Sequence, residues 1–217
     1  MRFSIIIESY FYAVKYKMTS RPRGRPRKFD QQVVLSHAIE VFLSKGFEGA
    51  SLDDLAEAMN MSRPSLYNAF GNKESIYRHA IEQFTSELKL IAGGALFQPG
   101  SLEQSLHSFY SRLMDVYYAS EPPQGCLVFC TTPVESISHA SIAEDLRRVI
   151  AEIDAVLESR FEQAQVAGDF PAEGDCALAG QLAQALLHSL ALRARSGTAR
   201  RELDKLMEYG IEALIAV

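Results

Sequence analysis

The chain has 217 residues, of which 47% are apolar, so it can bury a hydrophobic core and global disorder is excluded. Its longest apolar stretches are far too short for a membrane-spanning helix. The formal net charge is −5, but residues 1–75 carry +3 and residues 76–217 carry −8. Because phosphates repel the acidic part, we expect any nucleic-acid contact in the first third of the chain.

The first 28 residues precede the part that we expect to fold. Residues 1–20 can form a short helix or strand, and a translation start at Met18 is an equally acceptable interpretation. The apolar run between Glu8 and Lys15 is very short and no small-residue cleavage pattern follows it, so we expect no secretion signal and a cytoplasmic protein. Arg21–Lys28 holds five basic residues, and its prolines and glycine exclude regular structure. This segment, called the basic arm below, is expected to be a mobile cationic tail.

The next segment predicts three short helices. Asp30 is a suitable N-cap for the first, which the pattern ends at Gly46. Ser51–Asp54 resembles a capping box at the start of the second helix, and Ser62 caps the third. The second and third helices are joined by the turn Asn60-Met61. Two short helices with a tight turn between them predict a helix-turn-helix.

The third of these helices carries compact polar residues that suit the major groove of DNA. Arg63 can reach guanine edges and Asn68 can pair with adenine. Other hydroxyl and amine groups nearby are expected to contact phosphates, which position the protein without reading sequence. A solvated helix face is the alternative, but the caps, the turn and the basic arm together favour DNA binding. The predicted DNA contacts are Arg23, Arg25, Ser51, Ser62, Arg63, Ser65, Tyr67, Asn68 and Lys73.

The basic arm contains Arg23-Gly-Arg-Pro26, which resembles the core of an AT-hook. A flat Arg-Gly-Arg segment can enter an A·T-rich minor groove, where the potential is most negative. The alternative is a basic tail that attracts any DNA sequence. The sequence leaves both interpretations open.

The rest of the chain is expected to be helical throughout, with a break at Gly93-Gly94 and another at Pro99-Gly100. The expected helices span about 72–92, 101–119, 126–137, 141–167, 174–195 and 199–216. The sequence therefore predicts an all-α protein. We divide it into a flexible N-terminal extension (1–28), a helix-turn-helix DNA-binding domain (29–75), and a helical effector-binding and dimerisation domain (76–217).

The acidic C-terminal part shows no catalytic constellation, Gly-rich phosphate loop or metal-ligand spacing, so we expect no enzyme activity, cofactor or metal ion. An apolar pocket between its helices would suit an organic effector, although ordinary core packing is the alternative. Cys126 and Cys130 share a helical face and either sense oxidants or are buried and inert. The candidate pocket residues are Phe109, Leu113, Tyr117, Cys126, Phe129, Cys130 and Thr131.

Three motifs resemble the N-terminal signature of tetracycline-repressor-like (TetR/AcrR) regulators. They are Lys45-Gly-Phe47, Ser51–Ala58 and Ser62–Glu74, and the resemblance covers about residues 30–80. Ser51 departs from the more usual threonine but keeps the hydroxyl. More weakly, Gly125-Cys-Leu127 and the helical tail resemble a C-terminal subgroup of this family.

The resemblance implies an all-α homodimer that represses transcription from a (pseudo)palindromic operator and releases the DNA when a small molecule binds. It also implies that Tyr67 and Lys73 contact phosphates, and that Arg63, Ser65 and Asn68 lie near bases. The last two helices carry apolar stripes that suit either a dimer interface or an internal core, and the resemblance favours the dimer. The rival function is an architectural DNA-binding protein without an effector; an activator also remains open. The apolar stripes are Leu178, Leu182, Ala185, Leu186, Ser189 and Leu190, then Leu203, Leu206, Met207, Ile211 and Leu214.

Overall fold

The computed structural model describes residues 30–216, and every regular element in this range is helical, which confirms the all-α prediction. The elements are α2 (Gln31–Gly49), α3 (Leu52–Ala58), α4 (Arg63–Phe70), α5 (Lys73–Leu88), the π-helical segment η1 (Lys89–Gly93), α6 (Gly94–Leu96), α7 (Leu102–Tyr117), α8 (Leu127–Glu135), α9 (Ala140–Ala167), α10 (Cys176–Arg195) and α11 (Arg200–Ile215). None of these helices is long and apolar enough to cross a membrane. The basic arm, with Arg23 and Arg25, lies outside the described residues.

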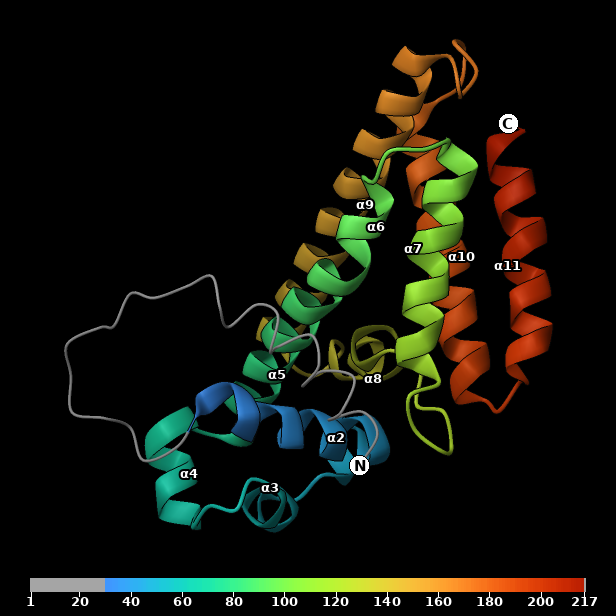
Figure 1. Cartoon of the computed structure of the whole chain (residues 1–217). Helices are drawn as coiled ribbons and strands as arrows, with labels where there is room; N and C mark the ends of the chain where they lie inside the picture. The colour runs from blue at the N-terminus through green and yellow to red at the C-terminus, as the bar shows by residue number, and fades with distance from the viewer. Residues whose placement is uncertain (1–29, 217) are drawn as a thin grey trace.

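The helices form two parts joined by α5 (Figure 1). The head, residues 31–70, contains α2, α3 and α4. The body, residues 94–215, contains α7, α9, α10 and α11 lying lengthwise, with α8 between them and the head. Helix α10 packs along α9 and α11, while α5 packs on α2 and also contacts α8 and α9. Helix α5 therefore touches both parts and can transmit a displacement from one to the other.

Side-chain caps explain where the short helices begin. The Asp30 carboxylate accepts a hydrogen bond from the Gln32 amide at 3.1 Å. Ser51 and Asp54 form the predicted capping box, and Ser62 and Asn72 accept from amides in the first turns of α4 and α5. Each cap satisfies a backbone N–H that has no partner within its helix. The predicted starts of these helices are thus confirmed.

One glycine prediction is confirmed and another is wrong. Gly46 has φ of +71° and ψ of 179°, outside helical geometry, so the first run of helix ends there as predicted, and a further helical turn within α2 continues to Gly49. The predicted break at Gly93-Gly94 is wrong, because both glycines have helical φ values of −60° and −62°. Glycine permits a break but does not impose one. The chain stays helical here because it buries Ala92, Ala95 and Leu96.

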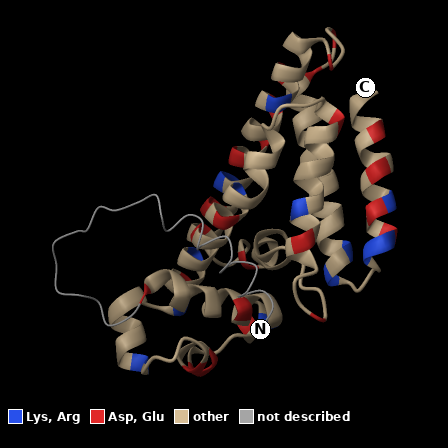
Figure 2. Ribbon diagram, viewed as in Figure 1, with Lys and Arg blue, Asp and Glu red and all other residues tan. Residues whose placement is uncertain are grey.

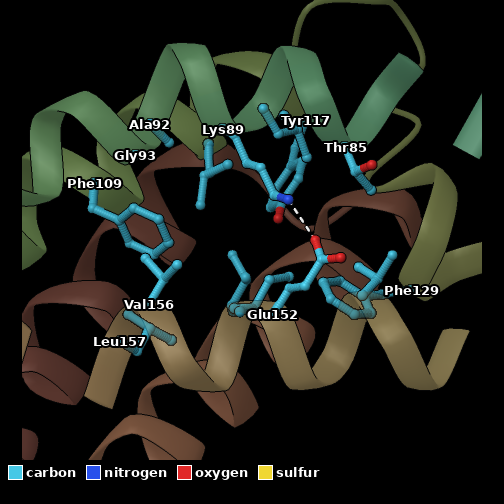
Figure 3. A pocket seen from close by; sticks show the side chains of 15 residues that line it. Thr85, Lys89, Ala92, Gly93, Phe109, Tyr117, Phe129, Glu152, Val156 and Leu157 are labelled. Atoms are coloured by element: carbon cyan, nitrogen blue, oxygen red, sulfur yellow. Dashed lines mark hydrogen bonds and ion pairs between the residues drawn. The ribbon is translucent and has the colours of Figure 1, made fainter. Parts of the chain in front are cut away.

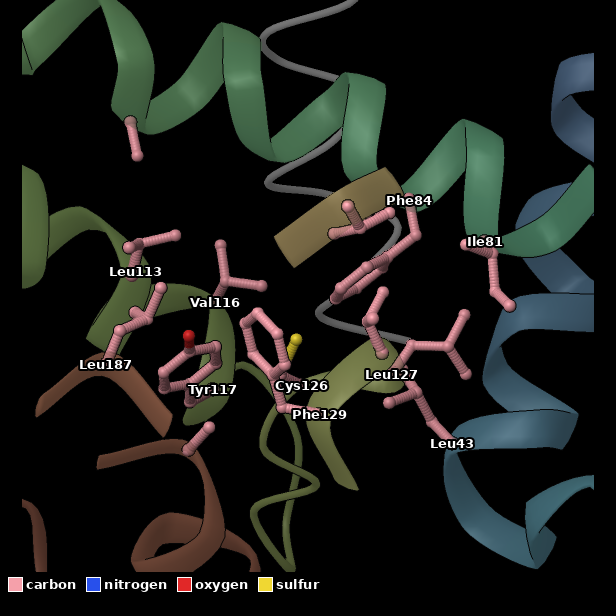
Figure 4. Packing of buried hydrophobic residues seen from close by; sticks show 14 of the residues in the cluster. Leu43, Ile81, Phe84, Leu113, Val116, Tyr117, Cys126, Leu127, Phe129 and Leu187 are labelled. Atoms are coloured by element: carbon pink, nitrogen blue, oxygen red, sulfur yellow. The ribbon is translucent and has the colours of Figure 1, made fainter. Parts of the chain in front are cut away.

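One continuous hydrophobic core runs from the head into the body (Figure 4). Tyr77 of α5 packs edge-on against Phe42 of α2, with ring centroids 4.8 Å apart, and lies 5.1 Å from the Phe47 ring. Leu43 of α2 and Leu127 of α8 belong to the same buried cluster. The head is therefore packed on the body rather than tethered to it.

Glu87 of α5 is a buried carboxyl group whose ionisation opposes folding. Only 9% of the residue is exposed, and burial raises its pKa from 4.5 to about 7, although a hydrogen bond from Gln83 partly opposes the shift. A raised pKa in an acid means that stability falls as pH rises through this window, by about 3 kcal/mol at 1.4 kcal/mol per pKa unit. We expect Glu87→Gln to raise the melting temperature at about pH 8 and to leave it unchanged near pH 4, measured by circular dichroism. The exposed Glu82→Gln is the control, and an equal gain there would contradict the prediction.

Candidate DNA-binding and effector sites

Helix α4 is anchored by its apolar side and presents its polar side to solvent. Leu66 and Phe70 are buried, whereas Tyr67 is 48% exposed. Serine, arginine and asparagine side chains fill the rest of the exposed surface. The predicted base and phosphate contacts exposed on or beside this helix are Ser62, Arg63, Ser65, Tyr67 and Asn68. This arrangement matches a reading helix, which needs its polar face free to enter the major groove.

Arg63 is paired with Asp53 of α3 at the start of this face. Its Nε donates to Asp53 Oδ1 at 2.5 Å, and Nη2 donates to the other carboxylate oxygen. The hydrogen bond from Arg63 holds the pKa of Asp53 below its ordinary value. Figure 2 shows basic colour at the start of α4 and acidic colour on α3, whose first turn holds Asp53 and Asp54. To read a guanine, Arg63 has to leave Asp53 or share its donors with it.

The two predicted backbone contacts flanking α4 are also engaged. The Ser51 hydroxyl accepts from the Asp54 amide at 3.1 Å and donates to Asp54 Oδ2 at 2.8 Å, while the residue stays exposed. The Lys73 ammonium lies 4.4 Å from the centroid of the Phe47 ring and 4.0 Å from a carboxylate oxygen of Glu48. Ser51 is exposed and the Lys73 side chain, at the start of α5, is 24% exposed, so a phosphate can compete for both groups.

Polar contacts tie the head and α5 to the body. The Tyr77 hydroxyl is hydrogen-bonded to the hydroxyls of Thr131, at 2.6 Å, and Thr132, at 3.1 Å. Arg195 at the end of α10 donates to the carbonyl oxygens of Leu43 in α2, at 2.8 Å, and of Gln124. Sequence reasoning did not find these contacts because each joins residues far apart in the chain.

An apolar pocket lies between α5, η1, α7, α8, α9 and α10 (Figure 3). Its empty space, including the part open to solvent, is about 620 Å³. Of the seven predicted pocket residues, Phe109, Leu113, Tyr117 and Phe129 line it. The other lining residues are Thr85, Leu88, Lys89, Ala92, Gly93, Val149, Glu152, Ile153, Val156, Leu157 and Leu187.

Three predicted pocket residues lie elsewhere. Thr131 is buried against Tyr77, and neither Cys126 nor Cys130 lines the pocket. Burial raises the pKa of the Cys126 thiol to about 12 and also raises the pKa of Cys130. Both cysteines are free thiols. Cys126 is buried and Cys130 half-buried, and a protonated thiol is a poor nucleophile, which favours the inert interpretation over oxidant sensing.

Four polar side chains, those of Thr85, Lys89, Tyr117 and Glu152, interrupt the apolar lining. Lys89 and Glu152 form an ion pair across the pocket (Figure 3). The buried hydroxyl of Tyr117 has no hydrogen-bond partner within the described residues, and burial raises its pKa well above the ordinary value. A buried hydroxyl without a partner is costly, so a bound molecule with a polar group would satisfy it.

A capped helix-turn-helix that exposes the polar side of α4 defines a DNA-binding transcriptional regulator. Residues 34–80 match the model of the bacterial regulatory proteins of the tetR family, and the relatives and solved structures described next support a TetR-family transcriptional regulator. This is a family of regulators rather than enzymes. The matched segment contains every predicted DNA contact except those in the basic arm.

Relatives extend the likeness over most of the chain. The HTH-type transcriptional repressor ComR of Escherichia coli (strain K12) is 27% identical over 189 residues, 87% of this chain and 89% of ComR. The negative regulator IcaR of the biofilm operon icaADBC in Staphylococcus epidermidis is 41% identical over 49 residues, 23% of this chain and 26% of IcaR. Among solved structures, a cysteine-substituted CifR, a TetR family regulator complexed with 26-bp operator DNA, superposes with a TM-score of 0.77 and 28% identity. That match covers 87% of this chain and 99% of CifR.

Proposed function

We propose that this protein is a repressor that binds a (pseudo)palindromic operator as a dimer and leaves it when a small molecule occupies the body. The observation that carries the proposal is the exposed polar face of α4 on an apolar anchor. In support, ComR is named a repressor, IcaR a negative regulator, and CifR was solved on operator DNA. Sequence-selective binding that a small molecule reverses is the behaviour to test for.

The exposed side chains of α4 have different proposed roles. Arg63 and Asn68 contact base edges, because a guanidinium and a carboxamide can each make paired hydrogen bonds to a purine. Ser65 also lies near the bases. Tyr67 and Lys73 hold phosphates and set the register of the helix in the groove. The roles of Arg23 and Arg25 in the minor groove remain a prediction.

A face of α10 supports the proposed dimer. Leu178, Leu182 and Leu192 are 49%, 44% and 52% exposed. With exposed Ala185 and half-buried Ser189 they follow one another at helical spacing on one side of the helix. Of the predicted α11 stripe, by contrast, Leu203, Met207, Ile211 and Leu214 are buried within the chain. A two-fold axis through the α10 face would set two α4 helices against half-sites about 34 Å apart.

The pocket in the body is the proposed effector site. Its apolar walls suit an organic molecule, and Tyr117, Lys89 and Glu152 offer polar partners at defined points. We infer an effector with an apolar body and at least one hydrogen-bonding group. Thr85 and Leu88 of α5 line the same pocket, while Tyr77 of that helix packs on the head. An effector that favours one position of α5 would thus shift the head between DNA-binding and released states.

Filling the pocket is expected to abolish the effector response without weakening operator binding. Gly93 lines the pocket, has helical backbone angles, and a Cβ added there meets nothing within 4 Å. We therefore expect Gly93→Leu to fold at least as well as the wild type, since glycine costs about 1 kcal/mol in a helix, and to keep its operator affinity. Fluorescence anisotropy of the operator complex, with a panel of apolar compounds added, measures the response.

Gly94→Leu is the matched control. Gly94 is also helical and its added Cβ also meets nothing within 4 Å, but the residue is exposed and does not line the pocket. This variant should release DNA like the wild type. If compounds release Gly93→Leu as readily as Gly94→Leu, the effector does not bind in this pocket.

A further inference from the structure

A second cluster of functional groups lies where the head meets the body. Glu48 near the end of α2, Glu135 at the end of α8 and His139 before α9 each offer one ligand atom, and these atoms lie within 4.8 Å of one another. The cluster is separate from both the α4 face and the apolar pocket. None of the three residues lines the effector pocket or is a proposed DNA contact, although Lys73, a proposed phosphate contact, lies 4.0 Å from Glu48 Oε2.

Glu135 is the most informative member. It is only 9% exposed, and its carboxylate has no hydrogen bond or ion pair to any described residue. A carboxylate that is largely withdrawn from water and has no paired cation gains from a cation placed beside it. The carboxylate is directed at Glu48 and His139, two groups that can share a cation with it.

His139 is held in an orientation that suits coordination. Its Nε2 lies 3.8 Å from Glu48 Oε1, while Nδ1 lies 3.4 Å from Glu74 Oε2. Ser141 donates a hydrogen bond to the other oxygen of Glu74 and so fixes this carboxylate. A histidine that binds a metal through one ring nitrogen commonly donates the other N–H to a carboxylate. Glu74 is placed to provide this second contact.

We propose that Glu48, Glu135 and His139 together bind one divalent transition-metal ion, with His139 coordinating through Nε2 and Glu74 acting as a positioning residue. One imidazole and two carboxylates suit zinc and related ions, and three protein ligands leave a position for water. Metal–ligand distances of about 2.0–2.2 Å require ligand atoms about 3.3 Å apart. The side chain of Glu48 is 73% exposed and can swing inward to close the site.

This site would join parts of the chain that move relative to one another in the proposed mechanism. Glu48 belongs to the head, whereas Glu135 and His139 belong to the body. A bound ion therefore favours the head position in which all three ligands meet. By linkage, the ion and the operator must change each other's affinity by the same factor. The inference thus adds a second, ionic input to a protein expected to respond to an organic effector.

The test is calorimetric titration of the full-length, tag-free and chelator-treated protein with zinc chloride. We expect one strong site per chain. Loss of a ligand in His139→Ala or Glu48→Gln should weaken binding at least about 10-fold, a loss of the size known for contacts around metal sites. His107→Ala, which removes an exposed histidine of α7, is the matched control and should bind like the wild type. Because Glu48 is exposed, its variant is expected to fold normally.

Cobalt absorption separates this site from the thiols and tests Glu74. Cobalt bound to oxygen and nitrogen shows only weak visible bands, whereas a strong sulfur-to-metal charge-transfer band would place the ion on cysteine and overturn the proposal. Glu74→Gln should alter the cobalt spectrum and weaken zinc binding, with no change in the melting temperature of the metal-free protein. Unchanged zinc affinity in both His139→Ala and Glu48→Gln, or no binding by the wild type, would mean that His139 only forms ion pairs.

Discussion

Replacing both Leu178 and Leu182 with glutamate is expected to convert the protein into a monomer. We expect the operator affinity to fall at least about 100-fold, because a dimer gains affinity of that order by binding two half-sites at once. Both side chains lie on the exposed face of α10, so the variant loses no contact of the core. Four carboxylates facing one another across a two-fold axis would repel and would have to lose water. Light scattering after gel filtration measures the mass, and anisotropy measures the affinity.

The same charges placed away from α10 provide the control. Val166 is 91% exposed at the end of α9, and Ala172 is exposed in the following turn, so Val166→Glu with Ala172→Glu should remain dimeric and bind DNA normally. A dimeric mass for the double α10 variant at micromolar concentration would show that the protein associates through another surface.

Removing two side chains from α4 is also expected to weaken DNA binding strongly. Tyr67 and Asn68 are exposed and contribute nothing to the core, so Tyr67→Ala with Asn68→Ala should melt like the wild type. Each base or phosphate contact contributes about 1–3 kcal/mol, and the two losses together predict at least about a 30-fold weaker operator complex. Anisotropy with a labelled operator, at one fixed salt concentration, measures the change.

The two single variants distinguish the proposed roles. Asn68→Ala should reduce the preference for the operator over scrambled DNA, whereas Tyr67→Ala should weaken both complexes about equally and leave their salt dependence unchanged, because a neutral phenol displaces no counterion. Gln163→Ala, which removes an exposed amide from α9, should change neither. If the double variant binds the operator like the wild type, α4 is not the reading helix.

The sequence predicted best those features that depend on residues close together in the chain. The N-cap residues Asp30, Ser51 and Ser62 each act on an amide two or three residues away, so their spacing alone located the helix starts. The class of protein followed from the same caps and from the polar residues of α4. The prediction of a helix break at Gly93-Gly94 was wrong. Burial of the neighbouring alanines overrode the weak preference of glycine against helix.

Contacts between distant segments could not be predicted. The pairing of Arg63 with Asp53, the Lys89–Glu152 ion pair in the pocket and the cluster around His139 all join different helices. Hydrophobic periodicity within one segment does not predict which side chains of two different segments come into contact. Glu135 and His139, four residues apart, were the one local sign of the third cluster, and that spacing is too common among helical residues to indicate a metal site by itself.

The most direct test of the central claim is fluorescence anisotropy of the wild-type protein on DNA from its own upstream intergenic region. A scrambled duplex of equal length is the control, and the titration is repeated over a series of salt concentrations. A sequence-reading repressor should bind the native duplex about 1,000-fold or more tightly than the scrambled one, and the preference should persist at physiological salt. Equal affinity for both duplexes, with a steep salt dependence, would contradict operator recognition there and favour an architectural DNA-binding protein.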